Sequence, residues 1–256
     1  MNIAIITARA GSKSIKNKNV YPVHGLPMIA YPIRAAQNAA RIDRIYVSTD
    51  GPSIADVALK MGCEVIWRPD ELAGDHVNHG DVIRHAVEYA ESPELRNVVV
   101  LLGNTVMVDG ALIDQGLKIL EERSDLDSVM SVWEAADDHP LRALEIRDGV
   151  LCPYGDPNRQ VSTERQSYSP AYYYDQGIWA FRKECVYRKD GPNPWWWMGK
   201  RSYPIVRNWV TGRDIHTHLD IELAAWWLTN VSNSSNGRNE ADEPRIDGVL
   251  RVDFGL

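Results

Sequence analysis

The chain begins Met1-Asn2-Ile3-Ala4-Ile5-Ile6-Thr7 and continues Ala8-Arg9-Ala10-Gly11-Ser12-Lys13-Ser14-Ile15-Lys16-Asn17-Lys18-Asn19. The residues from Ile3 to Thr7 form an apolar run of strand length, typical of a strand buried on both faces of a parallel sheet. A loop follows directly, at the position where open α/β sheets bind their ligands. This order of strand and loop predicts an α/β fold with a binding site beside the first strand.

The loop is strongly basic, although the protein as a whole is acidic. Arg9, Lys13, Lys16 and Lys18 fall within ten residues of a chain whose net charge is −7. Gly11 and the small residues beside it allow backbone N–H groups to approach a phosphate closely. The combination predicts an anion site, against the alternative of a basic loop exposed to solvent. The spacing is neither that of a Walker A loop nor that of the dinucleotide-binding G-x-G-x-x-G.

Strands and helices alternate beyond this loop. We expect strands at 3–7, 44–49, 63–67, 98–102 and 129–133, and helices at 28–40, 52–61, 82–90 and 111–122. Such alternation predicts a three-layer α/β/α sandwich with a mainly parallel sheet. Further along, residues 178–181 are expected to return to a strand and 219–230 to form a closing helix.

The shorter strands and turns of about 134–175 indicate a small lobe outside the main sheet. We therefore divide the chain into a main domain at 1–230, with the lobe inserted, and a polar linker and tail at 231–256, in which Val249 to Phe254 resembles a short extra strand.

Composition excludes several classes of protein. The 28 basic and 35 acidic residues argue against a general nucleic-acid surface. No run approaches the ~18 apolar residues of a membrane helix. The first residues already have a strand pattern, so we expect no signal sequence. The three cysteines are too few and too widely spaced for a disulfide framework or a cysteine-rich metal site. We expect a cytoplasmic protein without nucleic-acid or membrane partners.

An ordered series of motifs resembles the cytidylyltransferases that activate acidic sugars, of the CMP-N-acetylneuraminate synthetase type. The opening pattern A-R-x-G-S-K-x-I-x-x-K-N is matched by Ala8, Arg9, Gly11, Ser12, Lys13, Ile15, Lys18 and Asn19. Later matches are Val47-Ser48-Thr49-Asp50, Arg68-Pro69 through Leu72-Ala73 to Asp75, His139-Pro140, Arg165-Gln166 with Tyr172, and the strand from Gly177 to Phe181. The resemblance covers about residues 3–230 and implies a Rossmann-like nucleotidyltransferase sheet, with the lobe joining two subunits of a homodimer.

The resemblance also implies an activity and its residues. A nucleoside monophosphate, CMP from CTP first, would pass to an acidic sugar or related small acidic acceptor, with pyrophosphate leaving. The triphosphate would be held by Ala8, Arg9, Gly11, Ser12, Lys13, Lys18, Asn19 and Arg68, among which Arg9, Lys13 and Lys18 would be catalytic. The acceptor side would include Asn104, Arg165, Gln166, Tyr172 and Gln176. Positive side chains and a divalent cation, Mg²⁺ or alternatively Mn²⁺, suit a reaction whose transition state carries charge on phosphate oxygens.

Three departures from the family pattern lie around the acceptor or the metal. The usual D-x-D pair on a late strand is replaced by Asp214 and His216, counting back from Asp220. Mg²⁺ prefers oxygen ligands, so this change favours weaker Mg²⁺ binding or better use of Mn²⁺. Asn104 lies where the family has L-Q-P-T-S-P, and Gln176 replaces an Asn. We infer that the reaction type is retained and the acceptor is unusual.

Other interpretations remain open at this point. A guanylyltransferase of the same fold acting on a sugar phosphate is the second choice. If His216 and His218 share one face of a strand, a zinc-dependent hydrolase is conceivable, and a catalytically inactive sugar-nucleotide-binding homologue is the third class.

Several residues outside these motifs are expected to have structural roles. We expect Asp50 to cap the helix after Pro52. His76, His79 and His85 are expected to be ordinary polar residues. The Trp195–Trp197 run is expected to pack over a neighbouring element.

Overall fold

The structure, a computed structural model, describes residues 1–156, 158, 161–164 and 167–230. Its centre is a seven-stranded sheet in the order β11-β7-β10-β6-β1-β4-β5. Of these strands only β10 runs antiparallel to its neighbours. The strands are β1 (Asn2–Thr7), β4 (Arg44–Thr49), β5 (Glu64–Trp67), β6 (Asn97–Leu102), β7 (Ser128–Glu134), β10 (Tyr172–Arg182) and β11 (Ser202–Arg207). The predicted mainly parallel sheet is confirmed.

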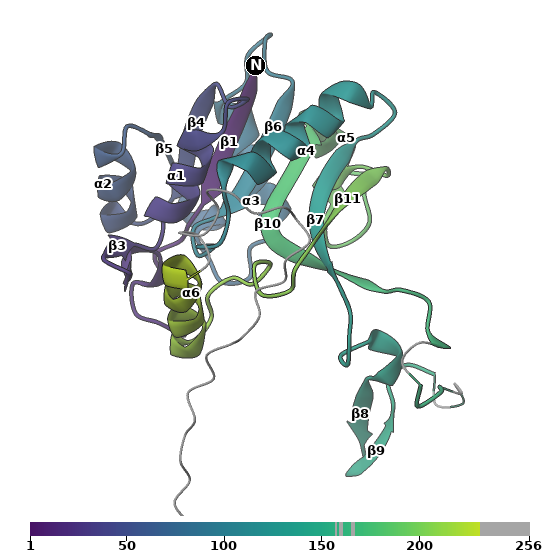
Figure 1. Ribbon diagram of the computed structural model, residues 1–256. Helices are drawn as coiled ribbons and strands as arrows, with labels where there is room; N and C mark the ends of the chain where they lie inside the picture. Colours follow the sequence, from purple (N-terminus) through teal and green to yellow (C-terminus); the bar gives the residue numbers. More distant parts are fainter. Residues whose placement is uncertain (157, 159–160, 165–166, 231–256) are drawn as a thin grey trace, which may run out of the picture.

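Helices cover both faces of the sheet, with α1 and α4 in front and α3 behind in the view of Figure 1. The front layer holds α1 (Ala30–Asn38), α2 (Pro52–Lys60) and α4 (Gly110–Glu122), and the back layer holds α3 (His79–Tyr89), α5 (Cys185–Arg188) and the short 3₁₀ helix η5 (Trp196–Met198). Alternate residues of β1 serve the two layers: Ala4 and Ile6 join the front core, while Ile3 and Ile5 join the back core. This two-sided burial explains the continuous apolar run in the sequence.

Local sequence sets where the helices begin. Pro52, with its fixed φ, is the first residue of α2. The Asn78 side chain accepts a hydrogen bond from the Gly80 N–H at the start of α3, and the Asp109 side chain caps α4 by accepting from the Leu112 N–H. Each cap satisfies a backbone N–H that has no partner within its helix.

The segment between β7 and β10 forms a small lobe that stands away from the main sheet (Figure 1). It contains the 3₁₀ helix η3 (Pro140–Arg142) and a hairpin of β8 (Leu144–Arg147) and β9 (Val150–Pro153). The hairpin turns at Asp148-Gly149, where both residues have positive φ. Its apolar side chains are exposed, led by Ile146 at 75%.

The closing helix α6 (His218–Asn230) covers the end of the basic loop. Ile221 and Ala224 of α6 pack with Ile15, Val23 and Met28 in a third apolar cluster. The hairpin of β2 (Pro22–Val23) and β3 (Leu26–Pro27) carries part of this cluster. The polar tail and the extra strand expected at 249–254 lie outside the described residues. No helix within the described part of the chain is long and apolar enough to cross a membrane.

The Trp195–Trp197 run packs over α3, as expected. Trp197 is 2% exposed, and a Cβ placed on Gly80 would lie 2.4 to 2.5 Å from ring atoms of Trp196 and Trp197. The glycine near the start of α3 therefore gives the two rings their space.

Candidate functional site

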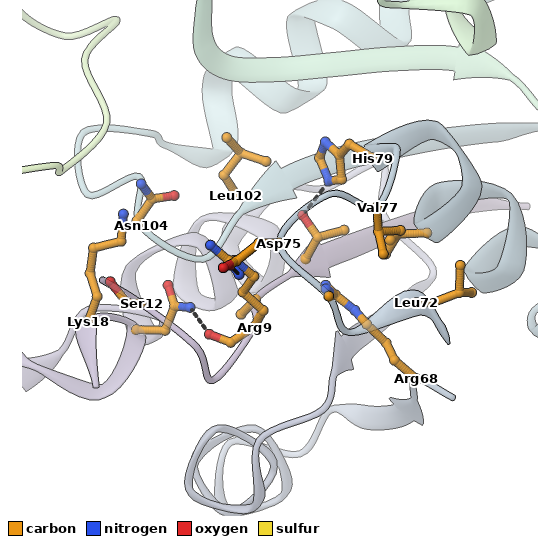
Figure 2. Close-up of a pocket in the computed structure, with 15 residues that line it drawn as sticks. Arg9, Ser12, Lys18, Arg68, Leu72, Asp75, Val77, His79, Leu102 and Asn104 are labelled. Atoms are coloured by element: carbon orange, nitrogen blue, oxygen red, sulfur yellow. Dashed lines mark hydrogen bonds and ion pairs between the residues drawn. The ribbon is translucent and has the colours of Figure 1, made fainter. Parts of the chain in front are cut away.

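A cavity of about 300 Å³ lies where β1, β4 and β6 end at their C-terminal edge. Figure 2 shows Lys18 and Asn104 on one side, Arg9 and Asp75 in the middle, and Arg68 and His79 on the other side. The residues that line it are Thr7, Ala8, Arg9, Ser12, Lys18, Asn19, Arg68, Leu72, Gly74, Asp75, Val77, His79, Val82, Leu102 and Asn104. The cavity thus lies at the sheet edge where the sequence predicts a ligand.

The backbone of the basic loop is held by hydrogen bonds from distant residues. The Ala10 N–H donates to Oδ1 of Asp50 at 2.8 Å, and Nδ2 of Asn19 donates to the Arg9 carbonyl at 2.9 Å. The expectation that Asp50 caps α2 is therefore wrong: Gly51 occupies the cap position, without a side-chain bond. Gly103 closes the other side, since a Cβ there would lie 2.7 Å from the Ala8 Cβ. These contacts fix the shape of the loop.

Three buried or half-buried cations face the cavity. Arg68 donates to the Oγ and the carbonyl of Ser48, and burial lowers its pKa to about 10, so it stays charged at neutral pH. Nζ of Lys18 donates to the Ile215 carbonyl at 2.9 Å. Burial also lowers the Lys18 pKa, although the Asp214 carboxylate opposes that shift. With Arg9, these side chains give the cavity a positively charged lining that suits an anion.

Asp75 is a carboxylate in the cavity that pairs with cations of the basic loop. Its Oδ1 pairs with Nη1 of Arg9, and its Oδ2 lies 2.6 Å from Nζ of Lys13. Hydrogen bonds from Lys13 and Arg9 lower the pKa of Asp75 to about 2. The sequence motif contains Asp75, but it was not among the expected site residues.

Asp214 lies in a corner beside the cavity. Its Oδ2 accepts from Nδ2 of Asn104 at 2.8 Å, and its Oδ1 lies 2.9 Å from Nε2 of His216. Gln176 is close to this corner, because its carbonyl accepts from Oγ1 of Thr105 and its N–H donates to the Gly212 carbonyl. The structure thus brings together Asn104, Asp214 and His216, with Gln176 beside them.

A buried ion pair anchors the chain that leads to this corner. The Asp175 side chain is fully buried and pairs with Nη1 of Arg207 at 3.2 Å. It also accepts from Ser131 and from the Gly177 N–H. A Cβ on Gly212 would lie 2.7 Å from the Asp175 Cβ. The segment before Asp214 is therefore packed directly onto β10.

Other expected residues lie elsewhere. Gly11 and Lys13 belong to the basic loop without lining the cavity. Tyr172 is 50% exposed and pairs with Glu134 at the lobe end of β10. Arg165 and Gln166 lie outside the described residues.

The geometry assumed for a zinc-dependent hydrolase is wrong. Residues 213–216 form no strand, and His218 begins α6 with its ring against Tyr21. Among the described residues, no group of three or more His, Cys, Asp or Glu side chains could hold a metal ion by itself.

His79 is a site residue that the sequence did not identify. Its Nε2 lies 2.9 Å from Oγ1 of Thr7, and its ring contacts Trp179 and Trp197 edge to face. Burial lowers the His79 pKa to about 4, so the ring is neutral at pH 7. The expectation of an ordinary polar histidine is wrong, because only the tertiary packing of α3 brings its first turn to the cavity.

Comparison with known proteins gives the chain a family context. A family model described as "Cytidylyltransferase" matches residues 3–143. CMP-N,N'-diacetyllegionaminic acid synthase of Campylobacter jejuni is 27% identical over 91% of this chain and 97% of its own length. N-acylneuraminate cytidylyltransferase of Escherichia coli is 31% identical over 87% of this chain, which spans only 51% of that relative.

A solved structure shares the fold. A CMP:2-keto-3-deoxy-manno-octonic acid synthetase, described as complexed with CTP, superimposes with a TM-score of 0.66. The match covers 89% of this chain and 98% of that one at 15% sequence identity. At that identity the likeness supports the α/β fold alone.

The neutral His79 predicts a specific pH dependence of stability. The His79 pKa in the folded protein, about 4, is below the ordinary value of 6.5. Between these two pH values the unfolded chain therefore binds a proton at His79 that the folded chain does not bind. Stability from this group is complete above about pH 6.5 and falls as the pH drops toward 4. The free energy of unfolding, measured in urea, should fall between pH 7.5 and pH 5 in the wild type. In His79→Gln this fall should be smaller by up to about 2 kcal/mol. The exposed His76→Gln should follow the wild type, and parallel profiles for all three proteins would contradict the prediction.

Proposed function

The chain belongs to the cytidylyltransferase family, and we propose that it transfers CMP from CTP to a small acidic sugar with release of pyrophosphate. It is a nucleotidyltransferase, and the guanylyltransferase and hydrolase alternatives are not favoured by the family match or by its relatives. The observation that carries the proposal is the convergence of Arg9, Lys18 and Arg68 on one cavity beside β1. The acidic sugars in the names of the relatives support the class of acceptor.

The reaction requires no covalent bond between the protein and the substrate. Attack of an acceptor oxygen on the α-phosphorus breaks the bond to the leaving pyrophosphate, so catalysis consists of positioning and charge stabilisation. Backbone N–H groups of the basic loop and Asn19 would orient the phosphates. Arg9, Lys13 and Lys18 would neutralise the charge that builds on the leaving oxygens. Arg68, held by Ser48, supplies a fixed positive charge on the opposite wall.

A divalent cation fits the corner at Asp214. Mg²⁺ is commonly held by one or two carboxylates together with substrate phosphates and waters, and Asp214 provides one carboxylate beside Lys18 and Asn104. His216, 2.9 Å from Asp214, is placed to be a second ligand or to contact the acceptor. When bound, the metal would neutralise charge on phosphate oxygens. An imidazole in place of a carboxylate favours Mn²⁺ over Mg²⁺.

The acceptor would occupy the space beside this corner. Asn104 and Gln176 are the proposed acceptor contacts at this corner, and both differ from the usual family residues. Asn104 is held by bonds to Asp214 and to the Ile215 carbonyl, so its orientation depends on the segment before α6. Arg165, Gln166 and Tyr172 remain proposed acceptor contacts on the sequence resemblance alone.

The lobe supports a homodimer. Leu144, Ile146, Val150 and Leu151 of the hairpin are each 57% to 75% exposed, an apolar surface that a monomer rarely leaves uncovered. A second copy of the chain is its proposed partner. Light scattering at micromolar concentration should give twice the mass of 28.9 kDa, and a clean monomer would overturn the dimer.

The activity is tested by pyrophosphate release from each of the four nucleoside triphosphates against sugar acids, sugar phosphates and phosphonates. We expect CTP with a sugar acid to give the highest kcat/KM. Release only from GTP with a sugar phosphate would favour the guanylyltransferase. No release from any pair would contradict the proposal.

Within the basic loop, Lys13 and Lys16 form a matched pair of exposed lysines. Lys13→Ala removes a charge that the transition state uses, and such a loss typically lowers kcat by about 10²–10³-fold. Lys16→Ala should change kcat far less, since Lys16 lies outside the motif. Steady-state pyrophosphate release measures both. Near-normal turnover of Lys13→Ala with loss of activity in Lys16→Ala would show that the loop is wrongly aligned.

The metal corner predicts opposite effects for its two residues. Asp214→Ala should abolish activity, because it removes the carboxylate beside Lys18. His216→Asp should improve the use of Mg²⁺ relative to Mn²⁺ if His216 is a ligand. If it contacts the acceptor, KM for the acceptor should rise while metal dependence is unchanged. If neither quantity changes, His216 has no role in the site.

A further inference from the structure

We propose that Asp75 is an internal counterion that occupies the phosphate position of the cavity and is displaced when the nucleotide binds. The proposal rests on the proposed function, because it assigns a competitor to the same triphosphate site. It makes Asp75 a positioning residue that tunes which anions the site accepts.

The contacts of Asp75 imitate those of a phosphate. One carboxylate oxygen pairs with Arg9 and the other lies 2.6 Å from Nζ of Lys13. These are two of the three cations that we expect to hold the leaving phosphates. Among the described residues that line the cavity, Asp75 is the single carboxylate. A phosphate that reaches Arg9 and Lys13 must therefore replace it.

The neighbouring cations have other partners. Arg68 donates to Ser48, and Lys18 donates to the Ile215 carbonyl. Neither contact involves Asp75, so its release would free Arg9 and Lys13 while the remaining charges stay in place. The competition is thus confined to one pair of cations in the cavity.

Release of Asp75 would also affect the rest of the cavity wall. Asp75 lies between η2 (Asp70–Leu72) and α3, in the same segment as Val77 and His79, which line the cavity farther from the basic loop. Breaking the pairs with Arg9 and Lys13 would remove two ion pairs that connect this segment to the loop. A triphosphate carries more negative charge than a monovalent anion, so it would compete better with Asp75 for these cations.

This arrangement lowers apparent affinity for every anion, because the site must first lose its own carboxylate. The two pairs are partly exposed, so their contribution is modest. We expect Asp75→Asn, which removes the competing charge with little change of shape, to bind pyrophosphate about 10-fold more tightly. In turnover, pyrophosphate should become a correspondingly stronger product inhibitor.

The test is calorimetric titration of the full chain with pyrophosphate at low and high salt. Asp75→Asn should gain affinity, and the gain should shrink as salt screens the charges. Asp75→Glu retains the carboxylate and should behave like the wild type. Asp81→Asn is the matched control, because it removes an equal charge that pairs with Arg84 on the surface of α3. Structural damage would weaken binding, so a gain of affinity cannot arise from misfolding.

Three results would overturn the inference, and they differ in their meaning. If wild type binds pyrophosphate and Asp75→Asn binds equally or more weakly, Asp75 is no competitor, while the proposed function stands. If neither protein binds pyrophosphate at any salt concentration, the cavity is not a phosphate site. The proposed function then fails together with the inference. An equal gain in Asp81→Asn would attribute the effect to net charge alone and would also overturn it.

Discussion

Positive charge held at one edge of a buried sheet is the constraint on which the rest of the site depends. Arg9, Lys18 and Arg68 face a single cavity, and like charges this close repel one another unless carboxylates or a ligand lie between them. Three aspartates meet the constraint in different ways. Asp50 holds the loop backbone through Ala10, Asp75 pairs with the loop cations, and Asp214 opposes the lowering of the Lys18 pKa. The site is therefore arranged around negative charge, which the phosphates of a nucleotide would also supply.

The sheet and its helices could be predicted because their signals are local. A strand buried on both faces, such as β1, leaves a continuous apolar run, and Pro52 marks a helix start. The predictions that were wrong, for Asp50 and His79, concern residues whose contacts lie far away in the sequence. Asp50 has the residue type of a helix cap. Its side chain instead accepts a hydrogen bond from the N–H of Ala10, forty positions away. In the sequence His79 is similar to any polar residue at a helix start. Its role depends on Thr7 of β1, which lies beside it only in the folded structure. No local pattern contains either partner.

The corner near α6 shows the same limit for the proposed metal ligands. Counting back from Asp220 identified Asp214 and His216. In the structure Nε2 of His216 lies 2.9 Å from Oδ1 of Asp214. Both residues lie on a segment without strand structure, held by the Asp175–Arg207 ion pair and by the absence of a side chain at Gly212. The residues that depart from the family pattern lie in or beside this corner, where we propose that the acceptor binds, while the basic loop keeps the family pattern. That division is the basis for proposing that the chain keeps the phosphate chemistry of its family and differs in its acceptor.

The central claim is that the cavity directs attack on the α-phosphorus of CTP. The most direct measurement uses CTP carrying radioactive phosphorus at either the α or the γ position, together with the best acidic acceptor. The account predicts that the α label appears in a CMP–acceptor conjugate and the γ label in pyrophosphate, in equal amounts. Label from the γ position in the acceptor, or α label only in free CMP, would contradict it, since the first indicates phosphoryl transfer and the second hydrolysis.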